Sequence, residues 1–198
     1  SQLQINVQEN QANAVLHLEA GERYIIADAT FGESRLAPDL VQELADMPVG
    51  SWYHANLIGD VYNRLLNSGY FASVNIEVEA RPPNRAYLQV DLEDLARHRV
   101  STGVGFGTDT GPWIKLRWER PALNERGHNF TAQAQLSSVA PELFTQYKIP
   151  WGHPQSEYIS WDNGWRRQDT EDVDTTVFTT GLSYHRLFGD SWVYSLHL

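Results

Sequence analysis

The stretch IKLRWE, residues 114–119, decides the fold, because apolar and charged side chains alternate through it without a break. Successive side chains of a β-strand point to opposite faces of the sheet, so a period of two predicts a strand with two chemically different faces. One face carries Ile114, Leu116 and Trp118, and the other carries the charged residues between and after them. The stretch therefore predicts a β-strand with one apolar and one charged side.

The rest of the second half of the chain follows the same pattern. Apolar and polar residues alternate in four further stretches, and short turn-like segments such as residues 124–127 separate them. The pattern predicts consecutive antiparallel strands after residue 98, among them residues 130–137, 143–149, 158–166 and 176–184.

A soluble β-domain and a transmembrane β-barrel both give this period, so alternation alone leaves the two open. Two features favour the barrel. The polar face is often charged, as a wet lumen allows, and aromatic residues cluster near predicted strand ends, as interfacial girdles require. In a barrel, Ile114, Leu116 and Trp118 would face lipid, because Lys or Arg at the bilayer midplane costs about 2–4 kcal/mol. The girdle residues would be Trp113, Trp118, Tyr147, Trp151, Tyr158, Trp161, Trp165, Tyr184 and Trp192.

The first half of the chain mixes helix and strand signals. Pro38 falls in the first turn of one predicted helix, and Pro48 and Gly50 end it. A second helix carries apolar residues at helical spacing, which predicts one buried face: Leu57, Ile58, Val61, Leu65 and Leu66. The predicted elements are strands at residues 14–19 and 23–31, helices at 39–47 and 53–67, and strands at 71–80 and 87–92. From residue 23 the order is βααββ, which predicts an α+β domain.

Composition excludes several classes of function. The chain has 198 residues and a formal net charge of −10, which argues against nucleic acid or anionic lipid headgroups as main partners, since both require a cationic face. It has no cysteine, so disulfides and thiol nucleophiles are impossible. No apolar run is as long as a membrane-spanning helix. The chain starts at Ser1 and stops inside an alternating run, so we expect it to be a piece of a longer protein.

The sequence offers no catalytic or cofactor motif. The seven histidines lack metal-ligand spacing, and there is no nucleophile elbow and no phosphate-binding glycine loop ahead of a helix. The acidic residues Asp169, Glu171, Asp172 and Asp174 could suggest calcium, but the glycine and terminal glutamate of a calcium loop are missing, which favours a solvated loop. We therefore expect a protein that is not an enzyme and that needs no cofactor.

Two parts of the chain resemble a known family. Residues 103–112, Gly-Val-Gly-Phe-Gly-Thr-Asp-Thr-Gly-Pro, are similar to the opening barrel strands of the TamA family, as are residues 138–142 and 147–150. Upstream, residues 67–74, Asn-Ser-Gly-Tyr-Phe-Ala-Ser-Val, resemble the segment that follows the second helix of a POTRA domain. TamA proteins are the outer-membrane subunits of the translocation and assembly module, within the BamA-like superfamily. The first similarity continues through Lys115, Trp118, Pro121, Asn124, Gly127 and His128.

The resemblance implies a POTRA domain followed by the N-terminal part of a transmembrane β-barrel. Residues 1–20 would be the tail of a preceding POTRA domain, residues 21–98 the barrel-proximal POTRA domain in the periplasm, and residues 99–198 the first strands of an outer-membrane β-barrel. Its partners would be outer-membrane lipid, client outer-membrane or autotransporter proteins, and an inner-membrane-anchored partner of the TamB type. A polypeptide export pore of the two-partner-secretion type is the alternative.

The first barrel strand carries a glycine on every residue of one face. In this superfamily the first and last strands meet at a seam, so the resemblance makes residues 102–107 a candidate lateral gate that pairs loosely because glycine weakens a strand. The alternative is that the glycines make room for a closely packed neighbour. The candidate gate consists of Thr102, Gly103, Val104, Gly105, Phe106 and Gly107.

A second candidate site is the edge of the α+β domain. An extended partner peptide could add a strand along residues 73–79 by β-augmentation. Alternatively, the charges of Glu77 and Glu79 blunt this edge and keep other chains away, as edge strands usually do. The residues concerned are Ser73, Val74, Asn75, Ile76, Glu77, Val78 and Glu79.

Overall fold

The structure is a computed structural model of the chain. It describes residues 2–6, 11–15, 22–108, 111–152, 156–170, 173–188 and 192–198. Asp109 and Thr110 of the glycine-containing motif lie outside the described residues, as do Glu171 and Asp172 of the acidic segment. Among the described residues, no helix is long and apolar enough to cross a membrane.

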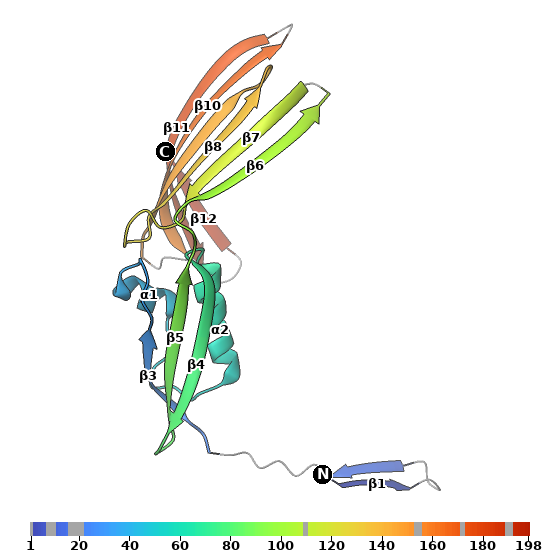
Figure 1. The fold of residues 1–198 in the computed structure, drawn as a ribbon, viewed down its shortest axis with the longest axis vertical. Coiled ribbons are helices and arrows are strands. Elements are labelled where there is room, and N and C mark those ends of the chain that lie inside the picture. The colour runs from blue at the N-terminus through green and yellow to red at the C-terminus, as the bar shows by residue number, and fades with distance from the viewer. Residues whose placement is uncertain are drawn as a thin grey trace.

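A βααββ unit fills the middle of the described chain (Figure 1). The sheet order is β3-β5-β4, with β5 parallel to β3 and antiparallel to β4. The sequence order predicted from residue 23 onward is therefore present. The elements are β3 (Ile25–Phe31), α1 (Pro38–Ala45), α2 (Ala55–Asn67), β4 (Phe71–Arg81) and β5 (Arg85–Asp94).

The helix ends lie close to where the sequence signals put them. Pro38 is at the first position of α1, where its missing N–H is not needed, and α1 ends at Ala45, two residues before the expected Met47. Asp46 takes a left-handed conformation there, with φ of 42°. Helix α2 begins at Ala55 rather than Tyr53, because residues 52 and 53 instead pair with the start of β3 through an Ile25–Trp52 bridge and a Tyr53 N–H to Tyr24 C=O bond.

The core of the unit lies between the two helices and the sheet. Only part of the apolar set predicted for α2 contributes: Val61 and Leu65 are fully buried and Leu57 packs against the cluster, whereas Ile58 and Leu66 are only half-buried. The buried cluster is Leu36, Val41, Leu44, Ala45, Val61, Leu65, Tyr70, Phe71, Val74 and Val90.

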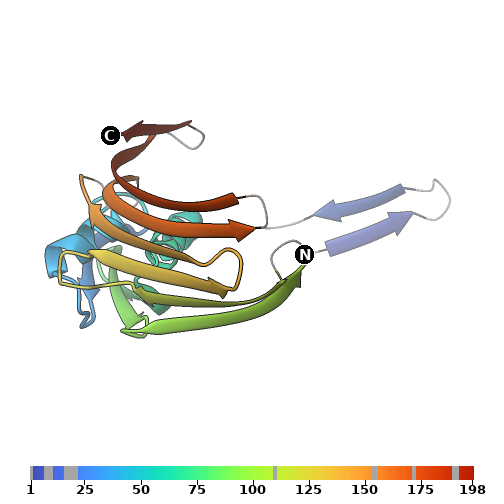
Figure 2. The same ribbon diagram turned by 90° about the horizontal axis from the view of Figure 1, so that it is seen from above.

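The second half of the chain forms one seven-stranded antiparallel sheet. Its order, β12-β11-β10-β9-β8-β7-β6, follows the sequence without a crossover, so β6 and β12 are its edges. Figure 2 shows the sheet curved into an open trough. The strands are β6 (Arg99–Gly107), β7 (Gly111–Arg120), β8 (Asn129–Ser137), β9 (Glu142–Pro150), β10 (Glu157–Thr170), β11 (Val173–Phe188) and β12 (Trp192–His197).

The N-terminal residues form a separate hairpin of β1 (Gln2–Asn6) and β2 (Gln11–Val15). The strand predicted for residues 14–19 therefore begins earlier than expected, at Gln11. Residues 16–19 lie outside the described residues.

The core of the unit supports a first prediction. Replacing Leu65 by alanine should lower the free energy of local opening around α2 by about 2–5 kcal/mol, because a fully buried leucine leaves a cavity when truncated. Hydrogen exchange of the α2 amides measures this energy. Leu66→Ala is the matched control, since the same atoms are removed from a half-buried neighbour. An equal loss in both variants would contradict the assigned core.

Candidate functional site: the first strand and its junction

Strand β6 has β7 as its only strand neighbour in the described chain. The strand is nine residues long, and on the face that it shares with Ile114 it exposes Val104 and Phe106, to 78% and 75%. A long edge with unpaired backbone groups and apolar side chains is a template for another strand. Residues 102–107, the candidate gate, therefore lie on an edge strand of the described sheet.

The glycine face of β6 does not behave uniformly. A Cβ atom built on Gly105 would lie 2.2 Å from Cζ2 of Trp113, the residue opposite it on β7. The indole ring therefore occupies the space that a side chain at residue 105 would fill. At Gly103 the nearest atoms would be 3.9 and 4.0 Å away, which is ordinary contact. Close packing therefore accounts for Gly105, whereas Gly103 is left without a steric reason to be glycine.

The outer face of the sheet is apolar. Ile114, Leu116 and Trp118 lie on it, exposed to 50%, 43% and 37%, and the registers of β6, β8, β9, β10 and β11 bring further apolar side chains to the same face. These include Val100, Val104, Phe106, Leu136, Leu143, Trp161, Phe178 and Leu182. A contiguous exposed apolar surface of this kind points to contact with a membrane or another protein.

An aromatic band crosses the outer face at the end nearest the βααββ unit. Trp118 contacts Phe130, Phe130 is opposite Tyr147, and Tyr147 is opposite Trp161 on the next strand. The polar tips of two of these residues bond to histidines outside the strands: Trp118 Nε1 donates to His98 Nδ1 over 3.2 Å, and the Tyr147 hydroxyl lies 2.6 Å from His128 Nδ1.

Two of the expected girdle residues are not on this face, and three are not at strand ends. Trp113 lies on the inner face over Gly105, and Tyr158 lies on the inner face with Lys148, whose ammonium is 4.0 Å from the ring centre. Trp161 and Trp165 lie inside β10, which runs from Glu157 to Thr170, and Tyr184 lies inside β11, which runs from Val173 to Phe188. The sequence pattern assigned too many aromatic residues to the girdle. The register of a strand decides which face of the sheet each side chain lies on, and composition does not give the register.

The inner face is polar and hydrogen-bonded. Gln146 Nε2 donates to Asp162 Oδ1 over 2.7 Å, and Ser160 donates to the other oxygen of Asp162 over 2.8 Å. Ser160 is fully buried and Ser183 nearly so, and Ser183 Oγ lies 2.8 Å from His197 Nδ1. Satisfied polar groups on this side and apolar groups on the other are the arrangement that a sheet between water and an apolar medium requires.

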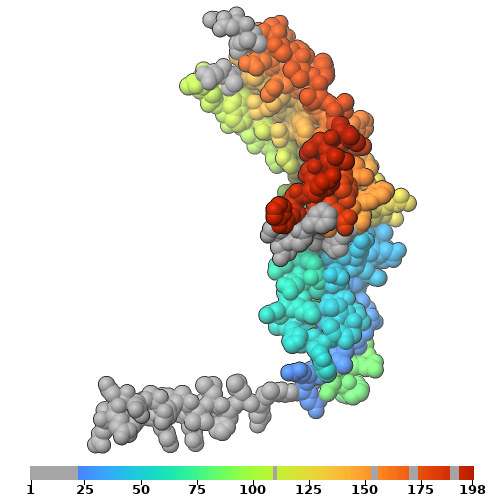
Figure 3. Space-filling view, turned by 180° about the vertical axis from the view of Figure 1, so that it is seen from behind, coloured from blue at the N-terminus to red at the C-terminus, as the bar shows by residue number. Residues whose placement is uncertain are grey.

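The loop between β7 and β8, residues 121–128, docks on the βααββ unit (Figure 3). The Ala37 N–H donates to Glu125 C=O over 2.8 Å, and the buried Tyr70 hydroxyl donates to Gly127 C=O over 2.7 Å. Gly127 has φ of +73°, and a Cβ there would lie 2.8 Å from the Tyr70 hydroxyl, so both conformation and space require glycine. Ala122 packs against the core cluster.

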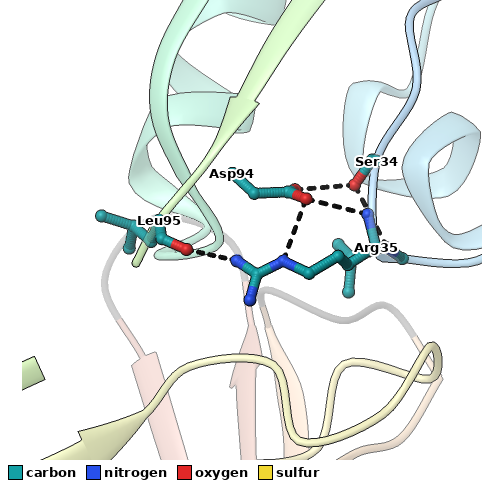
Figure 4. A network of polar contacts seen from close by, with 5 residues as sticks. Ser34, Arg35, Asp94 and Leu95 are labelled. Carbon is teal, nitrogen blue, oxygen red and sulfur yellow. Dashed lines mark hydrogen bonds and ion pairs between the residues drawn. The ribbon is translucent and has the colours of Figure 1, made fainter. Parts of the chain in front are cut away.

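A second set of contacts holds the chain where β5 leads into β6 (Figure 4). The Asp94 carboxylate accepts from Ser34 Oγ over 2.9 Å and pairs with Arg35 Nε at 3.1 Å, and Arg35 also donates to Leu95 C=O. The Leu95 N–H donates to Tyr70 C=O over 2.8 Å. The segment before α1 and the exit of β5 are therefore tied together beside the docked loop.

The other predicted sites lie apart from this junction. Strand β4, with Ser73–Glu79, is an edge of its sheet, and its exposed Glu79 pairs with Arg81 at 2.6 Å. That hydrogen bond lowers the pKa of Glu79, which keeps the edge charged. Of the acidic segment, Asp169 and Asp174 both pair with Arg167, at 3.0 and 3.3 Å. Among the described residues no cluster of three metal-ligating side chains forms.

Sequence reasoning missed the docked loop. The turn-like segment 124–127 was recognised, but its partner Tyr70 is 57 residues away from Gly127. The signal that could have found it is a glycine one residue before His128 in a loop that contains no other glycine, since a lone loop glycine often marks a left-handed residue or a close approach.

The glycine face supports a second prediction. Gly103→Val should stabilise the sheet by about 0.5–1 kcal/mol, because it removes backbone freedom and the added Cβ makes only ordinary contacts, at 3.9 and 4.0 Å. Gly105→Val should destabilise it by about 1–3 kcal/mol, because the Trp113 ring must move. The temperature at which half of the protein loses the gel mobility of the folded form shows whether each variant is stabilised or destabilised. Adding Trp113→Ala to Gly105→Val should recover stability, and effects of the same sign at both glycines would contradict the geometry.

The docked loop supports a third prediction, on pH. Burial raises the pKa of Tyr70 to about 12 from an ordinary value of 10.0, so the folded state holds a proton that the unfolded state releases first. Stability is therefore complete below pH 10 and falls as pH rises from about 10 to 12, by up to about 1.4 kcal/mol per pH unit. Tyr70→Phe should cost about 0.5–1.5 kcal/mol at neutral pH and remove this alkaline loss.

Urea denaturation at neutral and alkaline pH measures the Tyr70 effect. Tyr62→Phe is the matched control, because the same hydroxyl is removed from an exposed residue of α2. An alkaline loss of stability that persists unchanged in Tyr70→Phe would contradict the assignment.

Comparison with known proteins shows the fold. No protein-family model matches the chain. Among solved structures it is similar to BamA from Haemophilus ducreyi lacking POTRA domains 1–3, at 13% identity and a TM-score of 0.71 over 93% of this chain. It is also similar to CdiB from Acinetobacter baumannii, at 12% identity and a TM-score of 0.55 over 85% of this chain. The chain spans 36% and 35% of the lengths of these two structures. The mostly antiparallel strands with a few helices thus have the architecture of the corresponding part of BamA.

Proposed function

We propose that the chain is the barrel-proximal POTRA domain and the first barrel strands of a TamA-like assembly factor of the bacterial outer membrane. In this proposal residues 21–98 are the periplasmic POTRA domain, residues 1–20 end a preceding one, and residues 99–198 begin the barrel. The fold similarity to BamA supports the architecture, and the residues quoted above for the TamA family support the narrower assignment.

The observation that carries the proposal is the edge of β6, which pairs only with β7 among the described residues, beside an apolar outer face. A client strand that enters a membrane must satisfy its backbone groups, because lipid offers no hydrogen bonds. Strand β6 offers a row of such groups at the level of the apolar surface. No nucleotide site or catalytic step is part of the proposal, so the energy comes from the folding of the client itself.

The alternative is an export pore that threads a polypeptide through the lumen. The polar inner face, with Gln146, Ser160 and Asp162, would suit an extended hydrophilic chain. The two functions use different faces of the same sheet. Client proteins, outer-membrane lipid and an inner-membrane partner of the TamB type are the proposed partners for the assembly factor, which the exposed edge of β6 favours.

Site-specific photo-crosslinking in the full-length protein tests the proposal. A photoreactive phenylalanine at Val104, on the free edge, should crosslink to a client during its assembly. The same residue at Leu116 should not, because β7 is flanked by strands on both sides. Leu116 is the matched control, since it lies on the same face and is similarly apolar.

Two results would count against the assembly role. Equal crosslinking at Val104 and Leu116 would indicate that clients touch the outer face without pairing at the edge. Crosslinking confined to Gln146, on the inner face, would favour the export pore.

A further inference from the structure

A cavity of about 440 Å³ opens at the junction between the βααββ unit and the strands. The residues around it come from three segments that are far apart in the sequence: residues 34–38 before and at the start of α1, Arg97 in the linker before β6, and Arg120 at the end of β7 with residues 122–125 of the docked loop. None of these residues belongs to the strand edge where clients are proposed to pair.

Three arginines line the cavity, Arg35, Arg97 and Arg120. Arg35 is paired with Asp94, but no ion pair forms at Arg97 or Arg120 with any residue that the structure describes. Nε of Arg120 is buried and has no hydrogen-bond partner among the described residues. A buried guanidinium nitrogen without an acceptor is costly, so the site is incomplete as it stands.

Neighbouring arginines show that the lack of partners is local. On the inner face at the same end of β6 and β7, Arg99 and Arg117 both pair with Glu119, at 3.8 and 2.5 Å. The one carboxylate that lines the cavity, Glu125, makes no ion pair with the arginines there. Helix α1 also begins at the cavity, with no side-chain cap at its N-terminus, and adds the positive end of its dipole.

The position of Arg120 indicates what kind of anion fits. Arg120 lies on the outer face of β7, in line with Ile114, Leu116 and Trp118, and follows Trp118 of the aromatic band. In the proposed membrane orientation this is the level at which hydrocarbon gives way to headgroups. The planar guanidinium group binds phosphate through two parallel hydrogen bonds, so arginines are suited to phosphate esters.

We propose that this cavity binds the phosphate ester of an anionic phospholipid headgroup, with Arg97 and Arg120 as its ligands and the acyl chains along the apolar face of β7. The proposal rests on the membrane location proposed above, but not on client assembly. A net charge of −10 had argued against anionic lipid as a main partner, yet the charge within this cavity is locally positive.

The test measures lipid binding to the full-length protein in zwitterionic detergent. Phosphatidylglycerol is titrated in, and native mass spectrometry counts the bound molecules. Arg97→Gln and Arg120→Gln should each weaken binding about tenfold, the effect of losing one charge-assisted hydrogen bond. Arg126→Gln is the matched control, because it removes the same charge from the docked loop close to Arg120 but outside the cavity, and it should change binding less than about twofold.

Further variants distinguish a loss of lipid binding from a loss of folding. Arg97→Lys and Arg120→Lys retain the charge and should lose less affinity than the glutamine variants, and folded gel mobility checks each barrel. If all three glutamine variants weaken binding equally, diffuse surface charge is responsible and the proposal is wrong. Unchanged binding in folded Arg97→Gln and Arg120→Gln also overturns it.

Two additional measurements distinguish a lipid from a free phosphate ester as the ligand, and lipid binding from client assembly as the function. Glycerol phosphate at equal concentration should not displace the lipid, because it lacks acyl chains. Displacement would mean that the cavity binds phosphate esters without requiring a lipid, and it would overturn the lipid proposal. Client insertion is assayed on the same preparations. If lipid binding does not depend on the arginines but clients are still inserted, only the lipid site is refuted. If lipid binding depends on the arginines but no client is inserted, only the assembly role is refuted.

Discussion

The hydrogen bond from Tyr70 to Gly127 is the contact on which the relation between the two halves of the chain depends. It is buried, it joins the end of α2 to the loop between β7 and β8, and the Ala37–Glu125 bond acts beside it. The linker from β5 to β6 alone would leave the βααββ unit free to turn about a few residues. The docked loop adds a second connection, which fixes the orientation of the unit relative to β7 and β8. The first strands of the sheet, and not its far edge, are thus the ones tied to the unit.

The sheet itself is organised by the period of two. Because every second side chain turns to the same face, a run such as residues 114–119 separates apolar from charged groups without any long-range contact. The same geometry decides the role of individual residues. Trp113 is two residues away from Lys115, so both side chains lie on the inner face. Composition alone would assign Trp113 to a membrane interface, but its ring covers Gly105 instead.

Much of the architecture could be read from local signals. The start of α1 at Pro38, the βααββ order and the strands of the second half all follow from spacing within a few residues. Contacts between distant segments could not be read in this way, which is why the docking of Gly127 on Tyr70 was missed. Gly103 and Gly105 look alike in sequence, and only the ring of Trp113 distinguishes them. Net charge is coarse for a related reason: it sums over the whole chain, whereas a ligand at the cavity would meet only the few side chains gathered around Arg120.

The docked loop also has a mechanical consequence. A βααββ unit joined to the sheet at two points acts as a lever, and its fulcrum is the turn at residues 121–128. A pull on the far end of the unit, near the tip of the β4–β5 hairpin, is delivered as torque to β7 and β8 (Figure 1). Strand β6 is hydrogen-bonded to β7 along its whole length, so that torque would twist the free edge directly. Force applied to the far end of the unit would in this way change the tilt of β6, one of the two edge strands of the described sheet.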